Sequence, residues 1–350
     1  MRLERRTDVP FAVIAAAPVA AIAAALALGS VLIAMAGVGP FSAYAQLIDG
    51  AFGSRLAITE TLTRATPLIL TGLAAAVAFR CKLWNIGGEG QFYVGALVTA
   101  WLGHSSALAL PTPLGLVAVM AAGMSVGAML LAGPAFLRLR FGVDEVVTTL
   151  LLNFVVILFV GLMVEGPLRD PLAFGWPQSV PVDRSLRLPD LVPRSRLHVG
   201  LLVAIGAALV VWIVLSRTRF GFESKAAGLN PRAAAFAGIS LPKTIMGTAF
   251  LSGGLAGLAG SIEVLGVTGN VTTTLSPGFG YSGIVVAMLA ALHPIGVVVA
   301  AIFVATVFVG ADAMARATGV PSFIADVILS LSLLSMLVAL LFTTYRLRRQ

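Results

Sequence analysis

The chain contains few charged residues for its size. Only 11% of its 350 residues are Asp, Glu, Lys or Arg, whereas 59% are hydrophobic and the mean hydropathy is +1.00. Soluble domains typically carry about 25% charged residues. This scarcity excludes a soluble globular domain, and the long apolar runs indicate a protein whose solvent is the lipid bilayer.

Cysteine, histidine and lysine are also scarce, and each shortage excludes a class of chemistry. The one cysteine, Cys81, has no partner in the chain, so there is no disulfide framework. The histidines are scattered, and the sequence contains no HExxH motif, no Cys/His cluster with metal spacing and no GxSxG motif. None of the lysines, Lys82, Lys225 and Lys243, lies in a Walker A motif. We therefore predict no catalytic site, no metal and no cofactor bound by this chain, which cannot hydrolyse ATP alone.

Apolar runs near the length of a membrane span recur along the chain. A span needs roughly 20 apolar residues. The runs at 89–104 and 279–292 are short and have Gly or Pro at or near their ends, which is typical of broken or re-entrant helices that line a pathway. Misplaced boundaries are the alternative. The sequence predicts an all-α polytopic membrane protein of about ten transmembrane helices, near 11–38, 60–79, 89–104, 113–136, 144–165, 199–215, 244–266, 279–292, 294–312 and 323–342.

The positions of the basic residues indicate an orientation. With the N-terminus in the cytoplasm, 15 of the 23 Lys and Arg residues fall in inward seams, as the positive-inside rule requires. The net charge of +8 is therefore attributed to membrane orientation and not to nucleic-acid binding. We predict a multi-pass protein with cytoplasmic N- and C-termini. Its first run, 11–38, is expected to be retained because it exceeds the roughly 7–15 apolar residues of a signal peptide.

A proline-rich segment at 166–198 divides the chain. It carries six prolines and is expected to face outward, either as a lid or docking rim or as a passive connector. Five predicted spans lie on each side, in a first half at about 11–165 and a second half at 199–343. Because five is odd, the halves run in opposite directions, as inverted repeats around a midplane pathway do. Each half contains a Gly-rich stretch, at 85–96 and 276–287.

Small residues repeat at four-residue spacing in one predicted span. Gly253 and Gly257 are four apart, as are Ser252, Ala256 and Gly260. Such stripes let neighbouring helix backbones approach closely. They predict a tightly packed bundle and do not by themselves indicate a ligand.

Ionisable residues at membrane depth are costly and are candidates for function. Glu89 and Glu263 rank first, because neither has a basic residue three or four positions away. Glu89 lies in NIGGEGQ, whose polar groups come from Asn85, Glu89 and Gln91, and such a stretch must be buried in protein or line a cavity. For Glu89 we predict either a place on the translocation path or an interfacial helix cap. Four other ionisable residues are expected to pair at i,i+4 on one helix face, Glu60 with Arg64 and Asp312 with Arg316.

The richest charged seam is basic and lies at 217–243, between two predicted spans. Asn230 and Pro231 mark a helix start, because Pro is favoured at the first helical position, and Gly238 marks the end of this helix. A short helix with one arginine and one aromatic residue suits insertion into a groove of a soluble partner. The alternative is a helix that rests weakly on lipid headgroups.

Four motifs together resemble one family. They are FRCKLWNIGGEGQFYVGA at 79–96, RFGVDEVVTTLLLNF at 140–154, GFESKAAGLNPRAAAFAGIS at 221–240 and GFGYSGIVVAMLA at 278–290. Over about 60–342 the chain resembles the permease subunits of bacterial ABC importers, in the simple-sugar and nucleoside branch related to ribose and branched-chain amino acid permeases. The resemblance implies a type II ABC importer-like fold in the bacterial inner membrane, with one transmembrane permease domain over the whole chain.

The resemblance also implies partners and roles for particular residues. The partners would be a second permease in a homo- or heterodimer, two cytoplasmic ATP-binding subunits that hold ATP and Mg²⁺, and an extracytoplasmic substrate-binding protein or lipoprotein. The substrate would be a nucleoside or simple sugar. Coupling to the ATPase is carried onto Glu223, Lys225, Gly228, Asn230, Pro231, Arg232, Phe236 and Gly238. The candidates for the translocation path are Asn85, Glu89, Gln91, Asn153, Glu263, Phe279 and Tyr281.

Two other functions compete with this one. An ion-coupled secondary transporter of a small polar solute would use intramembrane carboxylates such as Glu89, Glu263 and Asp326, but it does not explain the helix in the cytoplasmic seam. A polytopic enzyme or scaffold acting on lipid would need a clustered catalytic set, which the sequence lacks.

Overall fold

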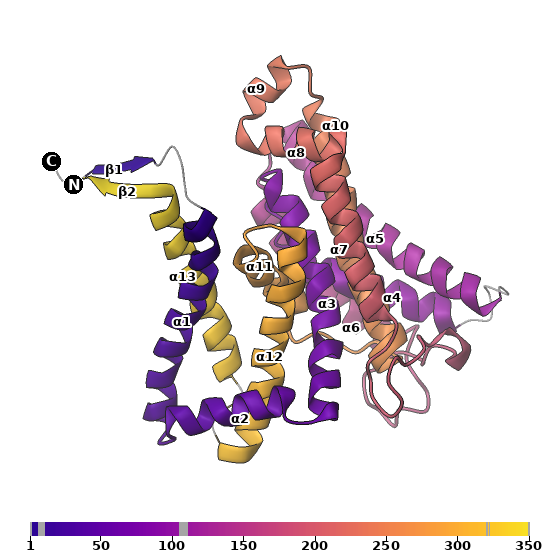
Figure 1. Ribbon diagram of the computed structural model, residues 1–350. Helices are drawn as coiled ribbons and strands as arrows, with labels where there is room; N and C mark the ends of the chain where they lie inside the picture. The colour runs from indigo at the N-terminus through magenta and orange to yellow at the C-terminus, as the bar shows by residue number, and fades with distance from the viewer. Residues whose placement is uncertain (1, 6–10, 105–110, 320, 322, 349–350) are drawn as a thin grey trace.

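The computed structural model of the chain describes residues 2–5, 11–104, 111–319, 321 and 323–348. The described elements are almost all helices (Figure 1), which confirms the predicted class. The strands form one antiparallel pair that joins the two ends of the chain. In chain order the elements are β1 (Arg2–Arg5), α1 (Phe11–Met35), α2 (Pro40–Phe52), α3 (Arg55–Arg80), α4 (Gly88–His104), α5 (Thr112–Phe141), α6 (Glu145–Glu165), η2 (Arg184–Leu186), α7 (Gly200–Arg217), α8 (Arg219–Leu229), α9 (Pro231–Phe236), α10 (Leu241–Glu263), the π-helix η3 (Val264–Thr268), α11 (Phe279–Leu289), α12 (Pro294–Thr318), α13 (Ile324–Thr344) and β2 (Tyr345–Arg348).

Several helices are long and apolar enough to cross a bilayer. Within the described residues there are six: α3, α5, α6, α7, α10 with η3, and α12. A seventh span is possible if α1 and α2, which are bent by 114° to each other, count as one. By contrast, α11 has 11 residues, or about 16 Å at roughly 1.5 Å per residue, against an apolar core about 30 Å thick. The chain is a polytopic helical membrane protein, and the number of ten spans stays a prediction.

Helix α2 was not predicted. It starts at Pro40 and buries Ala43, Leu47 and Ala51, which recur every four residues and so lie on one helix face. This face packs on α12, where a Cβ on Gly310 would overlap the Leu47 carbonyl. Two features of the sequence could have predicted this helix: the proline at its start and the four-residue spacing of its buried residues.

The central helices of the two predicted halves contact one another reciprocally. Helix α3 packs against α11 and α12, and α10 packs against α4 and α5. Helix α3 also contacts α10, and α4 contacts α11. If α3, α4 and α5 of the first half correspond to α10, α11 and α12 of the second, the contacts are symmetric. Each of α3 and α10 packs against two helices of the opposite half, and the two sets of helices correspond.

Glycines let α10 approach α4 and α5 closely. A Cβ on Gly253 or Gly257 would overlap a backbone carbonyl of α5, and one on Gly260 would overlap the Phe92 carbonyl in α4. Close helix contact accounts for this stripe, as the spacing predicts.

The segment at 166–198 folds against the end of α10. Backbone N–H groups of Ser179, Val182 and Leu188 donate to carbonyls in the 265–271 stretch at 2.8 to 3.0 Å. The segment also buries Val182, Leu186, Leu188 and Leu197, which add apolar contact. The segment is therefore an ordered cover on this end of α10.

His198 ends the cover as a buried, neutral imidazole. Burial lowers the pKa of its ring to about 4, although the nearby charge of Asp190 acts in the opposite direction. Nδ1 accepts a hydrogen bond from Gly200 N at 3.1 Å. A Cβ on Gly200 or Gly266 would overlap the ring, so these glycines make room for it.

Acidification is expected to loosen the 166–198 cover. When the cover is unfolded, His198 takes up a proton near its ordinary pKa of about 6.5, whereas in the folded cover it does so only near 4. The stabilisation is therefore complete above about pH 6.5 and is lost as the pH falls toward about 4. We expect amide hydrogen exchange of residues 178–190, corrected for the intrinsic rate, to accelerate between about pH 7 and about pH 5.

The His198→Asn variant is the control for this experiment. Its amide oxygen can accept the Gly200 hydrogen bond but does not titrate, so its exchange should not respond to pH in this range. An equal response in both proteins would contradict the role of His198.

Candidate translocation site and coupling segment

The two Gly-rich stretches of the sequence meet inside the bundle, where α4 and α11 begin. A Cβ on Gly280 would lie 2.6 Å from the Glu89 Cα, and one on Gly88 would lie 3.3 Å from the Gly280 carbonyl oxygen. Glycine at both positions allows the two backbones to touch. Each predicted half thus contributes one helix that begins inside the protein, which is the geometry of discontinuous helices at transport sites.

Glu89 joins these two helices. Its side chain is buried, with the residue 3% exposed, and the carboxylate accepts a hydrogen bond from Gly280 N at 2.6 Å. The N-cap of α11 is Gly278, which has no side chain to offer. Ser276 Oγ accepts from Phe279 N at 2.8 Å, and the carboxylate from α4 adds an acceptor for Gly280 N together with the negative charge that favours a helix N-terminus. For Glu89 the sequence left two roles open, a place on the path or a helix cap. The contact is that of a helix cap, but the capped helix, α11, belongs to the other half of the chain.

Asn85 and Gln91 bond to each other. Each side-chain amide donates to the other's oxygen at 2.9 Å. Asn85 also donates to Ser252 Oγ at 3.1 Å and accepts from Gly87 N at 3.0 Å. Both Asn85 donors are in use, so this pair holds the turn before α4 in place.

Asn153 and Tyr281 form the most accessible polar pair at the junction. The Asn153 side chain accepts from Gly90 N at 2.8 Å and donates to Ile86 O at 2.9 Å and to the Tyr281 hydroxyl at 3.0 Å. Asn153 is buried, whereas Tyr281 is 38% exposed. Phe279, in contrast, packs on Phe92 in the core, with ring centroids 5.8 Å apart. Tyr281 thus offers both an aromatic face and a hydroxyl.

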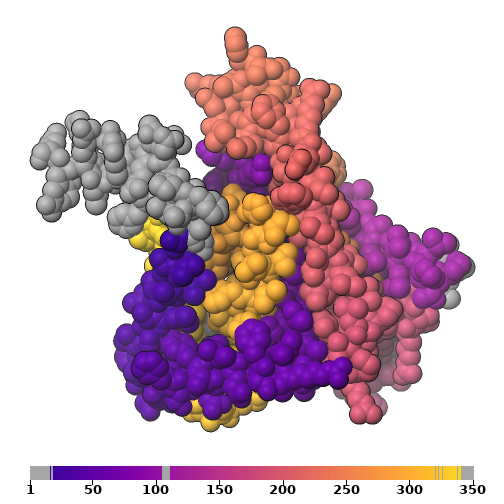
Figure 2. Space-filling view, in the orientation of Figure 1, coloured from indigo at the N-terminus to yellow at the C-terminus, as the bar shows by residue number. Residues whose placement is uncertain are grey.

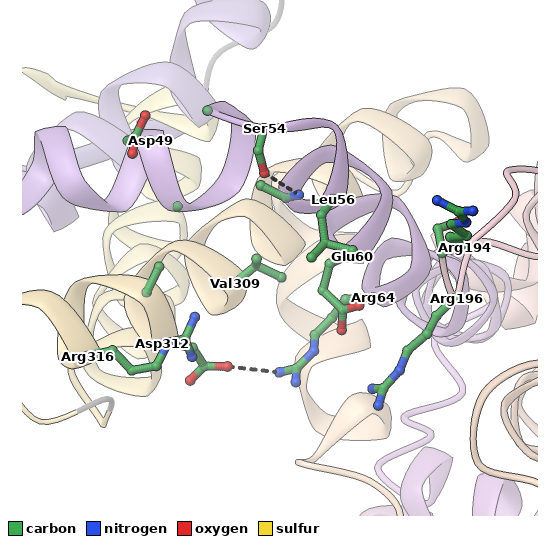
Figure 3. Close-up of a pocket in the computed structure, with 15 residues that line it drawn as sticks. Asp49, Ser54, Leu56, Glu60, Arg64, Arg194, Arg196, Val309, Asp312 and Arg316 are labelled. Atoms are coloured by element: carbon green, nitrogen blue, oxygen red, sulfur yellow. Dashed lines mark hydrogen bonds and ion pairs between the residues drawn. The ribbon is translucent and has the colours of Figure 1, made fainter.

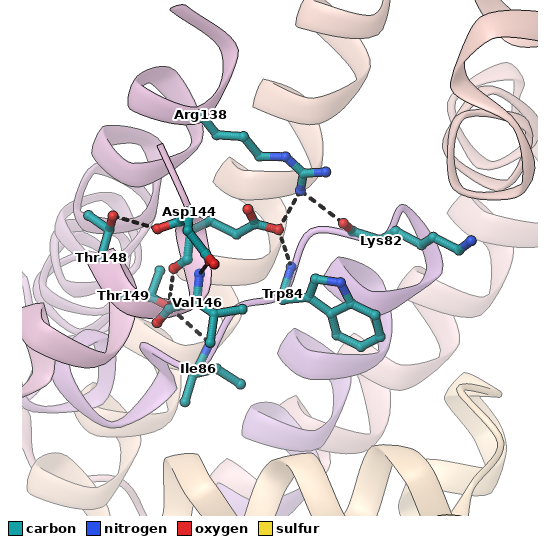
Figure 4. A network of polar contacts seen from close by, with 9 residues as sticks. Lys82, Trp84, Ile86, Arg138, Asp144, Val146, Thr148 and Thr149 are labelled. Carbon is teal, nitrogen blue, oxygen red and sulfur yellow. Dashed lines mark hydrogen bonds and ion pairs between the residues drawn. The ribbon is translucent and has the colours of Figure 1, made fainter. Parts of the chain in front are cut away.

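A second polar network, which sequence reasoning missed, fixes the stretch between α3 and α4 (Figure 4). Arg138 of α5 lies 2.6 Å from Glu145 Oε1 and donates to Lys82 O at 2.9 Å. Glu145 also accepts from Trp84 N at 3.3 Å, and Thr149 Oγ1 accepts from Ile86 N at 3.2 Å. The sequence offered one indication of this network. Asp144 in the DEVVTT motif is a typical N-cap residue, and the helix that it caps, α6, begins at Glu145.

Glu263 has different neighbours from the other path candidates. It is buried at the end of α10 and interacts electrostatically with Arg64, Glu60 and Arg196. These three residues line a cavity of about 860 Å³ between α2, α3, α12 and the 194–196 stretch (Figure 3). Helix α2 lies at the end of the molecule opposite α9 (Figure 1). The charged lining is Asp49, Glu60, Arg64, Arg194, Arg196, Asp312 and Arg316.

The expected pairing on single helix faces was wrong for this cavity. Arg64 Nη1 lies 3.8 Å from Asp312 Oδ2, so the ion pair joins α3 to α12. Among the described ion pairs, neither Glu60 with Arg64 nor Asp312 with Arg316 occurs. An ion pair between two helices occurs here instead of the expected ion pairs between residues four apart on one helix.

The basic seam folds into two helices, α8 and α9, that project from one end of the molecule (Figure 2). The predicted start and end of the short helix are confirmed: Asn230 Oδ1 accepts from Ala233 N at 3.1 Å, and Gly238 has a φ of +81°. Helix α8 was missed. Phe236, at the end of α9, is 97% exposed.

The other coupling residues predicted in the seam either contact the end of α3 or lie on the surface of α8 and α9. A Cβ on Gly228 would overlap the Arg80 carbonyl, so α8 contacts the end of α3 directly. Glu223 pairs with Arg219 on α8, with N and O atoms 2.7 Å apart. Lys225 and Arg232 are exposed, and Pro231 is the first residue of α9.

A polytopic helical bundle with discontinuous helices at its centre and a projecting helix at one end defines a membrane transport protein. Residues 57–344 match the family described as "Branched-chain amino acid transport system / permease component". The chain belongs to this family. It is therefore a permease component of an ABC transporter, a transport subunit and not an enzyme.

Several relatives are similar over nearly their whole length. The glucose ABC transporter permease protein TsgB13 of Haloferax volcanii is 33% identical, covering 99% of this chain and 93% of the relative. The guanosine ABC transporter permease protein NupP of Bacillus subtilis is 35% identical over 91% of each chain. The nucleoside ABC transporter permease protein NupB of Lactococcus lactis is 34% identical, covering 89% of this chain and 87% of the relative. Proteins of this kind work with ATPase and substrate-binding partners.

Proposed function

We propose that this chain is the membrane-spanning subunit of an ABC importer and forms the path for a nucleoside or a simple sugar. The observation that carries the proposal is the junction of α4 and α11, where Tyr281 is 38% exposed and its hydroxyl accepts from buried Asn153. An aromatic face beside a hydroxyl suits a base or sugar ring. The names of the relatives, which refer to nucleosides, guanosine and glucose, support this substrate class.

The proposed orientation places both termini and the α8–α9 projection in the cytoplasm of a cell with this chain in its inner membrane. The paired ends of the chain lie on the same side of the bundle as α9 in Figure 1, which supports this choice. The 166–198 cover and the cavity at α2 then face outward. A second permease, ATP-binding subunits that hold ATP and Mg²⁺, and an external substrate-binding protein or lipoprotein complete the transporter.

Two inverted halves, 11–165 and 199–343, are proposed within one permease domain. The reciprocal contacts of α3 with α11 and α12, and of α10 with α4 and α5, support a twofold relation. The axis would pass between α4 and α11, so the proposed site lies where the halves can move against each other.

The path residues divide by role in this proposal. Tyr281 contacts the substrate, Asn153 orients the Tyr281 hydroxyl, and Glu89 holds α11 against α4. Asn85, Gln91 and Phe279 maintain the shape of the junction. Glu263 is buried and interacts electrostatically with residues that line the outward cavity, whose arginines would contact the substrate-binding protein.

Coupling is proposed to run from α9 through α8 to α3. The ATP-binding subunit would receive α9 in a groove, with Phe236 as the apolar anchor. Because Gly228 contacts the end of α3, movement of α8 displaces α3, which packs on α11. ATP-driven closure of the partner subunits could thereby open or close the junction.

Radiolabelled uptake tests the function. Cells that express this chain with its ATP-binding and substrate-binding partners would be given adenosine, uridine, ribose and galactose separately. We expect nucleoside or sugar uptake that is abolished when the Walker lysine of the ATPase is replaced. Uptake that persists without ATP hydrolysis would overturn the proposal and favour an ion-coupled transporter.

The Phe236→Ala variant is expected to uncouple ATP hydrolysis from uptake. Removal of a central aromatic anchor typically costs more than about 1 kcal/mol, or roughly fivefold in a coupled step. Uptake per ATP hydrolysed should fall accordingly while membrane abundance stays constant, and Arg232→Glu should act in the same direction.

Phe41→Ala is the matched control for Phe236, because Phe41 is 95% exposed on α2 and Phe236 is 97% exposed on α9. It removes the same side chain from the opposite end of the molecule. Normal uptake in both α9 variants would exclude α9 from coupling.

A further inference from the structure

A basic cavity lies beside the α8–α9 projection. It has a volume of about 330 Å³ and lies between the end of α3, the end of α8 and the connection from α11 to α12. Its charged lining residues are Arg80, Lys82 and Lys225, His293 also lines it, and none of its described lining residues is acidic. Two of the three lysines in the whole sequence line this one cavity.

The nearby carboxylates do not neutralise these cations. Glu145 pairs with Arg138, and Glu223 pairs with Arg219. Among the described residues, neither Lys82 nor Lys225 forms an ion pair. The cavity therefore keeps an unbalanced positive charge.

Arg80 is only partly satisfied. Its Nη2 donates to Leu215 O at 3.1 Å, but its buried Nε has no hydrogen-bond partner in the described structure. A buried donor without an acceptor costs free energy, and such a group calls for an explanation. Arg80 therefore keeps donor capacity that the described structure does not use.

The cavity wall contains strained backbone. Lys82, Ala291 and Leu292 have φ values of 53°, 48° and 60°, in the left-handed region that residues other than glycine rarely adopt. Such residues cluster at functional sites, where the surrounding structure holds them. Here they belong to the two turns that frame the cavity.

We propose that this cavity receives an acidic side chain of the ATP-binding subunit, next to the groove that receives α9. The inference rests on the proposed function, since it presumes that α9 contacts that subunit. Two observations favour this occupant. The cavity shares Gly228 and Leu229 with the turn into α9, and Leu229 is 68% exposed, so the basic cavity and the apolar anchors form one continuous surface. A carboxylate also complements its charge and can accept from both lysines and from Arg80.

A carbodiimide, which joins a lysine amine to a carboxylate with loss of water, tests the contact in the assembled transporter. Mass spectrometry of the treated complex should find cross-links from Lys82 or Lys225 to an Asp or Glu of the ATP-binding subunit. Lys243, the third lysine, is exposed at the start of α10 and lies outside the cavity lining. Cross-links confined to Lys243, in an intact complex, would overturn the proposal.

Variants supply a second readout. The double variant Lys82→Gln/Lys225→Gln should release the ATP-binding subunit about tenfold faster, because truncation of one side of a buried, hydrogen-bonded charge pair acts mainly on the dissociation rate. Arg140→Gln/Arg217→Gln removes the same charge from exposed positions outside the cavity and should have little effect. Equal effects of both pairs would mean that only overall charge matters, against the proposal.

Two failures can be told apart. If no complex with the ATP-binding subunit forms, or uptake does not need ATP, the proposed function fails. If the complex and ATP-dependent uptake are normal but the cavity lysines are not cross-linked, only this inference fails. Retention of anionic phospholipid that is lost in the lysine double variant would then assign the cavity to lipid.

Discussion

Valine at Gly260 is expected to prevent assembly of the helix bundle. A Cβ at this position would overlap the backbone carbonyl of Phe92, where α10 crosses α4. Neither backbone can rotate away as a flexible side chain would, so one helix must move. Overpacking of a close-packed core costs about 1–3 kcal/mol or more, a large part of a marginal stability. After solubilisation in detergent, we expect size-exclusion chromatography to recover little of this variant as a folded, monodisperse species.

Gly206→Val provides the matched control. Gly206 lies in α7, and no atom lies within 4 Å of where its Cβ would be. The substitution introduces the same β-branched residue into a helix, with the same small gain in helix propensity over glycine. Equal loss of both variants would attribute the damage to a β-branched side chain at any helical glycine and would contradict the close contact of α10 and α4.

Most helices were predictable because the apolar pattern that indicates them is local. The run at 144–165 corresponds to α6, and 89–104 corresponds to α4 within one residue. The ends of α9 were predictable because Asn230 and Gly238 act on their own backbone neighbours. Helices α2 and α8 were missed because each is interrupted or bounded by glycine and reads as a polar break between longer apolar runs.

The contacts of the site were not predictable, because they depend on tertiary neighbours. Glu89 and Gly280 are separated by 191 positions in sequence. Nothing in NIGGEGQ indicates that its carboxylate meets a second Gly-rich stretch. Arg64 follows the same principle: its expected local partner lies four residues away, yet it pairs with Asp312. Residue type identified these positions as important, and only the fold determines their partners.

The Glu89→Gln variant is expected to lower uptake by at least about tenfold with little change in membrane abundance. A hydrogen bond to a charged group contributes about 1.5–3 kcal/mol, and glutamine replaces one acceptor oxygen with an amide that can only donate. It also removes the negative charge beside the α11 N-terminus. Helix α11 should then be held less firmly against α4 while the bundle around it persists.

Comparison with Tyr281→Phe separates a positioning role from substrate contact. The Tyr281 variant keeps the ring and removes only the hydroxyl that Asn153 bonds. If Tyr281 contacts the substrate, its variant should raise the apparent KM, and by different factors for a nucleoside and a sugar. If Glu89 positions α11, its variant should instead lower the maximal rate by a similar factor for every substrate transported. A substrate-dependent KM change for Glu89→Gln would move Glu89 onto the path, and parallel loss of uptake and abundance would assign it to folding alone.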